Sequence, residues 1–292
     1  MMKGRIMKVS KYLVLALLGV MVAALAVVGC SSGSSSKSAS TSASSASASA
    51  SASASASSAA AGDIKLIANG KLTIATSPDY PPFENLENGQ YVGLDIEIAK
   101  AVAKELGLEP EFKTLQFDAI IPAIAAGGQA DIGISGFSVD PERAKEIDFS
   151  SSYYIDDQAV AVMNSSTITD ANADAELNKE GVIIAVQSGT TGEAYVQENY
   201  PKATAQAYGN STDAFAAMQS GQANAVCTNK AVVEAMLADA YKDAKVVKSI
   251  ATGEEYAIVV SKDNTALTAA INDALAKLKA DGTIEKLTNQ FM

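Results

Sequence analysis

The sequence contains no histidine and no tryptophan, and it has two cysteines, Cys30 and Cys227. Without histidine, Ser-His and Cys-His nucleophile pairs are excluded, together with most zinc sites. Cys227 lies in an apolar stretch, which predicts a core residue rather than a reactive thiol. We therefore expect neither a cofactor nor a metal.

Positive charge is also scarce, with 22 Lys and Arg against 33 Asp and Glu and a net charge of −11. Four of the basic residues lie within residues 3–11, so the rest of the chain is more acidic still. Such acidity favours solubility and argues against nucleic acid or an anionic membrane surface as a partner. We expect a monomer.

The N-terminus has the pattern of a secretory signal, in which basic residues precede an apolar run from 12 to 28. The run is nearly long enough for a transmembrane helix. It ends in "VVGC", residues 27–30, which resembles the lipobox of bacterial lipoproteins; a chance Gly-Cys is the alternative. The resemblance implies a signal peptide over 1–29 and a lipidated Cys30, and two acyl chains would hold the protein at the bacterial membrane, outside the cytoplasm.

Residues 30–62 are almost entirely Ser and Ala, with Lys37 as the only charge. Such a segment cannot bury enough apolar surface to offset the loss of chain entropy. The composition predicts a flexible tether, and the sequence leaves open whether it is glycosylated.

The remaining residues, about 230, alternate between strand and helix patterns and suffice for one large or two small domains. In the first block we expect strands at 71–77, 111–116 and 130–135 and helices at 94–108 and 117–128. In the second we expect strands at 182–188, 204–209, 224–229 and 244–250, with helices from Thr190 and at 212–221 and 230–240. A strand at 255–262, a helix at 265–280 and a short last helix follow. This order predicts an α/β fold of βα units with a mainly parallel sheet.

Ligands of such sheets bind beyond the carboxyl ends of the strands. The turn "GISGFSVDPER", residues 133–143, follows one such strand and ends in Arg143, whose planar fork matches a carboxylate. Ser138 adds a hydroxyl and a backbone N–H. The alternative is an ordinary helix start capped by Asp140, which does not require Arg143 because a cation is unfavourable there.

Three other strand ends carry candidate residues. Tyr80 and Phe117 could close on the apolar part of a small ligand, although both could also be core residues. "QSGTTGE", residues 187–193, opens a helix at which Thr190 or Thr191 could bind an anion. For this motif alone a plain helix cap is the better explanation, and its spacing does not fit a phosphate loop.

The stretches "GKLTIATSPDYPPFE", "YVGLDIEIAKAVAKELG", "FDAIIPAIAAGGQADIGISGFSVDPERAKEIDFSSSYY" and "VQSGTTGEAYV" resemble the family-3 bacterial solute-binding proteins, the polar amino-acid receptors of ABC importers. The resemblance covers nearly all of 63–292. It implies a two-lobed periplasmic-binding-protein fold of type II, in which the chain crosses twice at the hinge. Lobe 1 should hold 63–156 and 253–292, and lobe 2 should hold 157–252.

The resemblance also implies roles for individual residues. Arg143 should grip the α-carboxylate of an amino acid, helped by backbone N–H groups of Ser138 and Thr191, while Tyr80 and Phe117 cover the ligand. The Gly136 carbonyl, the Ser138 hydroxyl and an acid from lobe 2 should hold the α-ammonium. The whole expected site comprises Ser77, Tyr80, Phe117, Ser135, Gly136, Ser138, Arg143, Gln187, Thr190, Thr191 and Asn229.

Two positions depart from the family pattern. Asn229 stands where the family usually has Asp, so the acid expected from lobe 2 is missing, and a buried ammonium without a carboxylate is costly. Either neutral dipoles suffice or the ligand carries no full ammonium. Ser77 stands where binders of cationic amino acids often have an acid, with Asp79 two residues on, and Gln187 is a neutral partner from lobe 2. These residues favour a polar neutral amino acid.

We therefore predict a lipid-anchored receptor that captures an amino acid by hinge closure and docks on a transmembrane permease. One alternative is an enzyme resembling the dehydratases of cyclohexadienyl acids, for which Glu193 or Asp118 would be the general acid by position only. Another is a ligand sensor for a membrane signalling protein, which would use the same pocket.

Overall fold

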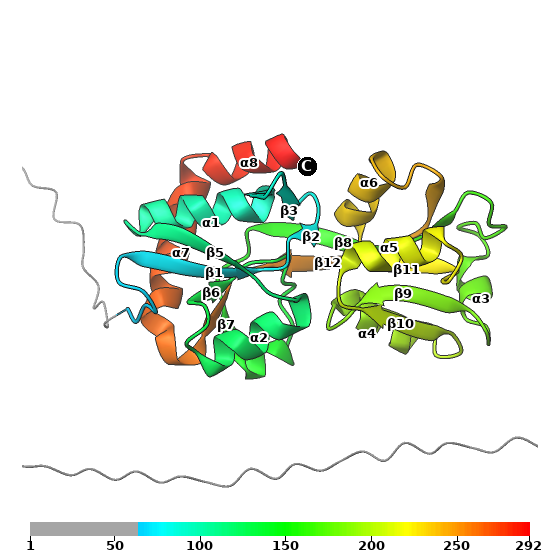
Figure 1. The fold of residues 1–292 in the computed structure, drawn as a ribbon, viewed down its shortest axis with the longest axis horizontal. Helices are drawn as coiled ribbons and strands as arrows, with labels where there is room; N and C mark the ends of the chain where they lie inside the picture. The colour runs from blue at the N-terminus through cyan, green and yellow to red at the C-terminus, as the bar shows by residue number, and fades with distance from the viewer. Residues whose placement is uncertain (1–63) are drawn as a thin grey trace, which may run out of the picture. The chain divides into compact units, whose positions relative to one another are not determined.

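The computed structural model describes residues 64–292. The predicted signal peptide, the lipidated Cys30 and the Ser/Ala tether lie outside the described residues. Two five-stranded sheets and one small three-stranded sheet organise the described chain (Figure 1). We call the part built on the first large sheet lobe 1 and the part built on the second lobe 2.

Lobe 1 has the strand order β5-β1-β6-β13-β7. Its strands are β1 (Lys71–Thr76), β5 (Glu109–Thr114), β6 (Ile132–Gly133), β7 (Ile147–Phe149) and β13 (Val259–Ser261), and its helices are α1 (Leu94–Glu105), α2 (Phe117–Ala126), α7 (Thr265–Ala280) and α8 (Thr283–Phe291). Strand β1 is parallel to β5 and β6, whereas β13 is antiparallel to both of its neighbours. A short 3-10 helix, η2 (Lys262–Asn264), joins β13 to α7.

Lobe 2 has the strand order β10-β9-β11-β8-β12. Its strands are β8 (Tyr154–Met163), β9 (Ile183–Gln187), β10 (Thr204–Tyr208), β11 (Ala225–Asn229) and β12 (Ala244–Tyr256), and its helices are α3 (Ala173–Leu177), α4 (Thr191–Asn199), α5 (Ser211–Gln219) and α6 (Lys230–Ala238). Strands β9, β10 and β11 are parallel, while β8 and β12 pair antiparallel. The parallel expectation thus holds for the βα units but not for β8 and β12, nor for β13 in lobe 1.

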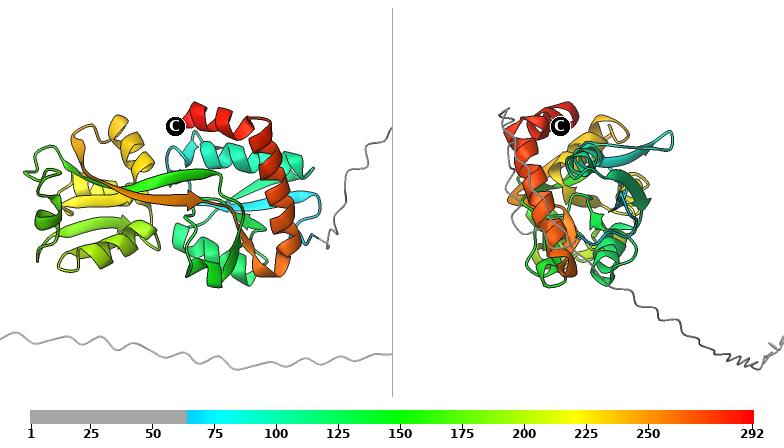
Figure 2. Two further views of the ribbon diagram at one scale, coloured as in Figure 1. Left: turned by 180° about the vertical axis from the view of Figure 1, so that it is seen from behind. Right: turned by 90° about the vertical axis from the view of Figure 1, so that its left-hand side faces the viewer.

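Strands β8 and β12 connect the lobes (Figures 1 and 2). Their pairing runs from Ala244 opposite Met163 to Tyr256 opposite Tyr154, with irregularities between Val246 and Lys248 and between Ile250 and Glu254. The predicted lobe boundaries at 156/157 and 252/253 fall inside these two strands. The sequence patterns predict no strand at 154–163, and they predict that the later strand ends at Ile250, whereas β12 continues to Tyr256.

The small three-stranded sheet carries Tyr80, the first residue of the cavity described below. It consists of β2 (Asp79–Tyr80), β3 (Glu84–Glu87) and β4 (Gln90–Val92). Gly93 then begins α1 with φ 125°, and a Cβ atom there would lie 2.2 Å from the Phe83 carbonyl oxygen. Only glycine fits such a position. The close approach holds α1 against the turn that carries Tyr80.

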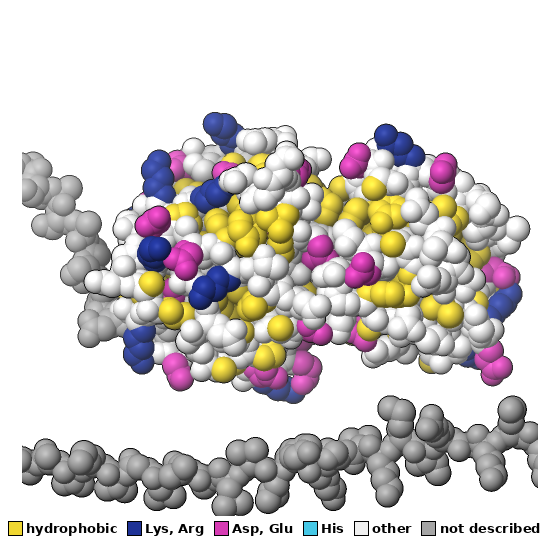
Figure 3. Space-filling view, viewed as in Figure 1, with side chains coloured by type: hydrophobic (Ala, Val, Ile, Leu, Met, Phe, Trp, Pro, Cys, Tyr) yellow, Lys and Arg dark blue, Asp and Glu magenta, His cyan; other side chains and the backbone are white. Residues whose placement is uncertain are grey.

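Buried apolar residues fill both lobes, and the largest cluster of them extends from one lobe into the other. Ile74 of β1 and Val102 of α1 are fully buried in lobe 1, and Val186 of β9 and Cys227 of β11 are fully buried in lobe 2. Hydrophobic side chains also gather on lobe 1 near the end of α8 (Figure 3), where Phe291 lines a surface hollow. Within residues 64–292, no helix is both long and apolar enough to cross a membrane.

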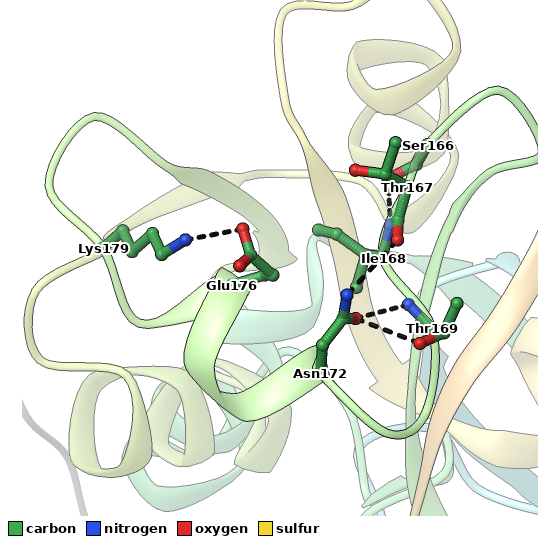
Figure 4. A network of polar contacts seen from close by, with 7 residues as sticks. All are labelled: Ser166, Thr167, Ile168, Thr169, Asn172, Glu176 and Lys179. Carbon is green, nitrogen blue, oxygen red and sulfur yellow. Dashed lines mark hydrogen bonds and ion pairs between the residues drawn. The ribbon is translucent and has the colours of Figure 1, made fainter.

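Polar contacts fix the far end of lobe 2, between β8 and α3 (Figure 4). The Asn172 side-chain oxygen accepts hydrogen bonds from the backbone and hydroxyl of Thr169, at 2.7 and 3.2 Å. Glu176 and Lys179 form an exposed ion pair one turn later. These residues order a loop that lies away from the strand ends discussed below.

Candidate functional site

Eight of the eleven expected site residues line one small cavity between the lobes. Lobe 1 contributes five of them and lobe 2 three: Tyr80, Phe117, Gly136, Ser138 and Arg143, and Thr190, Thr191 and Asn229. Seven of them lie at a strand end or in the first residues after one, as the βα pattern requires, and Arg143 lies at the end of the turn that follows β6. That these residues bind a ligand remains a prediction.

The Arg143 guanidinium is held on two backbone carbonyls. Its Nη1 donates to Ser138 O and its Nη2 to Gly189 O across the cavity, both at 2.9 Å. Its Cζ lies 5.4 Å from the centre of the Phe117 ring and 5.7 Å from that of Phe137. A guanidinium carries five N–H donors, so others remain for an anion in the cavity. Burial lowers the pKa of Arg143, while the charges of Asp140 and Glu254 oppose that effect.

The turn around Asp140 aims this arginine. Asp140 Oδ1 accepts hydrogen bonds from the backbone N–H groups of Glu142 and Arg143, at 2.8 and 3.0 Å. Asp140 is therefore a cap, as the simpler explanation of the motif expected. The element that follows is only one 3-10 turn, η1 (Arg143–Lys145). A carboxylate cap beside a single turn positions the arginine without starting a long helix.

Tyr80 joins the two lobes and does more than cover the cavity. Its hydroxyl lies 2.6 Å from Thr228 Oγ1 and donates to Asn229 Oδ1 at 2.7 Å. The ring is 5% exposed, and burial raises the pKa of the phenol well above its usual value. The Asn229 side-chain oxygen, expected to face a ligand, is thus occupied by a tyrosine of lobe 1.

The two threonines of lobe 2 have different tasks. Thr190 caps α4, since its Oγ1 accepts from Glu193 N at 3.2 Å and donates to Gln187 O at 2.7 Å. The plain-cap explanation therefore describes its side chain. Thr191, the first residue of α4, instead donates its hydroxyl to Glu254 at 2.8 Å.

Three expected site residues do not line the cavity. Ser135 turns its hydroxyl inward, where it donates to Glu84 Oε1 at 2.6 Å and accepts from Ser77 N at 3.1 Å. Ser77 donates to Asp79 Oδ1 at 2.8 Å. Gln187 reaches Asp79 Oδ2 and Gly209 O at 3.5 and 3.4 Å. These groups brace the site from behind or beside it.

Asp79 links lobe 1 to the start of α5. Its Oδ2 accepts a hydrogen bond from the backbone N–H of Ser211 in lobe 2. Burial raises the pKa of the Asp79 carboxyl, and its hydrogen bonds oppose that shift. A carboxylate at a helix N-terminus is stabilised by the free N–H groups there, so Asp79 acts as a contact between lobes.

A buried carboxyl pair supports the lobe 1 wall. Asp95 Oδ2 accepts from Gly136 N at 2.7 Å and from the Tyr153 hydroxyl at 2.8 Å, beside the Ser135–Glu84 bond. Burial raises the pKa of Asp95 to about 6 and that of Glu84 well above its usual value. Each carboxyl is fully buried and has one oxygen without a hydrogen-bond partner among the described residues, so burial favours the protonated form of the pair. Both residues lie in stretches that resemble the family pattern, 70–84 and 91–107, but the resemblance assigned no role to either of them.

Sequence reasoning also missed Glu254, in the hinge strand β12. Its Oε2 accepts hydrogen bonds from the Ser138 and Thr191 hydroxyls and from Asn229 Nδ2, the last at 3.3 Å. Its Oε1 accepts from Gln158 Nε2 at 2.9 Å. The only signal was a polar run, "TGEE", in the strand that returns to lobe 1.

The candidate general acids of the enzymatic alternative do not line the cavity. Glu193 accepts a hydrogen bond from Gly189 N at 2.8 Å, within the turn that begins α4. Asp118 lies in the first turn of α2. No cluster of three or more potential metal ligands occurs in the described part of the chain.

Comparison with known protein families matches residues 72–292 to the bacterial extracellular solute-binding proteins, family 3. The chain belongs to this family. The predicted membership is thereby confirmed, and the family places the protein among extracytoplasmic solute-binding proteins.

Two bacterial relatives show the range of ligands in the family 3 solute-binding proteins. The chain is 33% identical over 226 residues to ABC transporter arginine-binding protein 1 of Escherichia coli K12, which covers 76% of this chain and 90% of that protein. It is 32% identical over 229 residues to the ABC transporter glutamine-binding protein GlnH of Bacillus subtilis 168, covering 77% and 82%.

Solved structures agree with the sequence relatives. An ancestral arginine-binding protein bound to glutamine matches with a TM-score of 0.72 and 36% identity, over 77% of this chain and 99% of that one. The ancestral amino acid-binding protein AncCDT-1, a precursor of cyclohexadienyl dehydratase, matches with a TM-score of 0.70 and 37% identity, over 76% and 95%. The predicted two-lobed type II fold is confirmed.

Proposed function

We propose that this protein is a lipid-anchored substrate-binding protein of an amino-acid ABC importer, which binds a polar neutral amino acid by hinge closure. The carrying observation is the convergence of residues from both lobes on one cavity that contains Arg143. A ligand that touches both lobes shifts the open–closed equilibrium toward the closed state. The permease partner follows from relatives named as ABC transporter proteins.

The preference for a neutral side chain rests on the surroundings of Asp79. This carboxylate is the acid nearest the expected side-chain end of the site, and it already accepts from Ser77 and from the N-terminus of α5. Its neighbour Gln187 is neutral. Because the negative charge is already compensated by donors, it offers little to a guanidinium or ammonium side chain.

Anchoring rests on residues 1–30, where a signal pattern ends at Cys30 within a lipobox-like sequence. Two acyl chains on one cysteine would hold the protein stably at the membrane. The binding lobes would then stand off the membrane on the Ser/Ala segment and reach the permease from outside.

The proposal is tested by calorimetric titration of the full chain in detergent micelles, after unfolding and refolding to remove any carried ligand. The panel contains all common amino acids, cystine, prephenate and acids that lack an α-ammonium. We expect micromolar or tighter binding of one polar neutral amino acid. Arg143→Ala should lower that affinity by about 100-fold or more, because a charged partner of the α-carboxylate is lost.

Lys145→Ala is the matched control, since it removes an exposed cation two residues away in the same turn. It should leave the affinity unchanged. The absence of binding to any amino acid, or dehydration of prephenate, would contradict the receptor function and favour the enzymatic alternative. Tightest binding of arginine would contradict only the neutral side-chain preference.

A further inference from the structure

The missing acid at position 229 leaves a question about the ligand's ammonium. In the structure, both ends of the Asn229 amide are engaged: Oδ1 accepts from the Tyr80 hydroxyl at 2.7 Å and Nδ2 donates to Glu254 at 3.3 Å. An ammonium has three donors and no acceptor. Asn229 therefore presents it with neither a free oxygen nor a negative charge.

Glu254 places a carboxylate next to the Asn229 side chain, with its Oε2 at 3.3 Å from Asn229 Nδ2. Three groups that donate to its Oε2 belong to residues lining the cavity, namely Ser138, Thr191 and Asn229. Its fourth donor, Gln158 Nε2, comes from the fully buried glutamine of β8. The carboxylate is thus held by side chains of lobe 1, lobe 2 and the hinge.

All four donors are neutral. Among residues 64–292, no Lys or Arg forms an ion pair with Glu254, and none of the ion pairs includes Arg143 either. Arg143 lines the cavity, while Glu254 is hydrogen-bonded to three of its lining side chains. The two charges form no ion pair, although the charge of Glu254 partly offsets the lowering of the Arg143 pKa by burial. A zwitterion with its two charged groups on one carbon is the small molecule that complements such an arrangement.

We propose that Glu254 supplies the negative charge that holds the ligand's α-ammonium, in place of the acid that lobe 2 lacks at Asn229. The inference rests on the proposed function and specifies its substrate class as α-amino acids with a free ammonium. In the complex, the ammonium donates to Glu254 while Arg143 receives the α-carboxylate. The hydroxyls of Ser138 and Thr191 can rotate to accept from the ammonium.

A different role for Glu254 predicts the opposite change in ligand affinity when its charge is removed. The Glu254 carboxylate accepts from the same kind of donors that would bind a ligand's own carboxylate, so it could act as an internal competitor. Removing the charge would then strengthen binding. Under our proposal it weakens binding, because a buried ammonium is left without a counter-charge.

The test uses Glu254→Gln, which preserves size and an acceptor oxygen but removes the charge. The full chain is titrated with the amino acid that it binds most tightly and with the analogue lacking the α-amino group; L-glutamine and 4-carbamoylbutanoate are the first pair. We expect the variant to lose about 30-fold or more in affinity for the amino acid. Affinity for the analogue should stay constant or rise.

Glu255→Gln is the matched control. It removes the same charge from the adjacent, exposed residue, whose backbone oxygen accepts from Val139 N whether or not the side chain is charged. It should change neither affinity. The double variant Asn229→Asp with Glu254→Gln returns a carboxylate to the cavity from lobe 2, and it should recover much of the lost amino-acid affinity. Retained binding of the analogue by Glu254→Gln shows that the single variant is folded.

The outcomes separate the two proposals. If the wild type binds an amino acid and Glu254→Gln binds it equally well or more tightly, the role of Glu254 is wrong while the proposed function stands. Equal losses for the amino acid and its analogue would also overturn it, since the ammonium would not be the group recognised. If the wild type binds no amino acid at all, both proposals fail.

Discussion

The two walls of the cavity are built differently. On lobe 1, Ser135 and Gly136 are tied to the buried Glu84–Asp95 pair, and Arg143 is aimed by the Asp140 cap. On lobe 2, the cavity residues are the first residues or caps of α4 and α6. Thr190 bonds within its own turn, whereas Thr191 and Asn229 bond to Glu254 of the hinge strand and Asn229 also bonds to Tyr80 of lobe 1. The comparison indicates that lobe 1 presents a preformed binding surface, and that lobe 2 completes it by contacts that exist only when the lobes meet.

The largest effect should be on the pH dependence of stability, which depends on the buried carboxyls of Glu84 and Asp95. Raised carboxyl pKa values mean that Glu84 and Asp95 contribute stability below their unfolded pKa values near 4, and that this contribution is lost as the pH rises through about 6 and beyond. Glu84→Gln imitates the protonated pair, because its amide can donate to Asp95. Its unfolding free energy should fall less than that of the wild type as the pH rises from about 4 through about 6.

Chemical denaturation at a series of pH values measures this difference. Glu87→Gln, on the exposed end of β3, removes the same charge and should leave the wild-type pH dependence in place. Parallel curves for Glu84→Gln and the wild type would mean that the lobe 1 wall does not depend on protonation of the pair.

A smaller effect is expected where lobe 2 meets lobe 1. Asp79→Ala removes the carboxylate that accepts from Ser211 N across the cleft. The closed state should become less populated, so amino-acid affinity should fall by about tenfold in calorimetry. Asp213→Ala, an exposed acid in the first turn of the same helix, is the control. If Asp79→Ala binds as tightly as the wild type, lobe 2 does not need this contact to close.

The smallest effect concerns the interior of lobe 2. Cys227 is fully buried in β11, and burial raises the pKa of its thiol to about 12. Because the thiolate is the reactive form, a thiol reagent should modify Cys227 only when the lobe 2 core opens. The rate at which the Cys227 thiol is labelled in increasing concentrations of denaturant, detected by mass spectrometry, measures that opening. Rapid labelling without denaturant would contradict this expectation and show that the lobe 2 core opens readily in the native state.

Much of this arrangement could be predicted from regular patterns. The helix expected at 265–280 coincides with α7, and the strands before the cavity end where apolar runs give way to polar turns. Parallel strands bring their carboxyl ends to one edge, so Thr191 and Asn229 could be grouped without a structure. Arg143 follows a strand of the other sheet, and only the family resemblance placed it in the same site. Strand β8 was missed because its polar first half, "YIDDQ", hides the pattern of a strand.

The missed site residues share a physical cause. Glu254 lies inside an antiparallel strand that connects the lobes, so the rule about strand ends does not reach it. Glu84 and Asp95 resemble ordinary surface acids in the sequence, and only the three-dimensional packing buries them side by side. Gly136, by contrast, was expected because the family resemblance assigned its carbonyl to the ligand's ammonium.

The attachment of β12 to lobe 1 bears on how a ligand would first be captured. Val139 N donates to Glu255 O and Ala257 N to Phe137 O, so the strand is fastened to lobe 1 one residue after Glu254. Arg143 and Glu254 therefore stay near each other when lobe 2 moves away. A diffusing amino acid would meet both charges in a single encounter, and closure of lobe 2 would lengthen its residence time rather than decide its recognition.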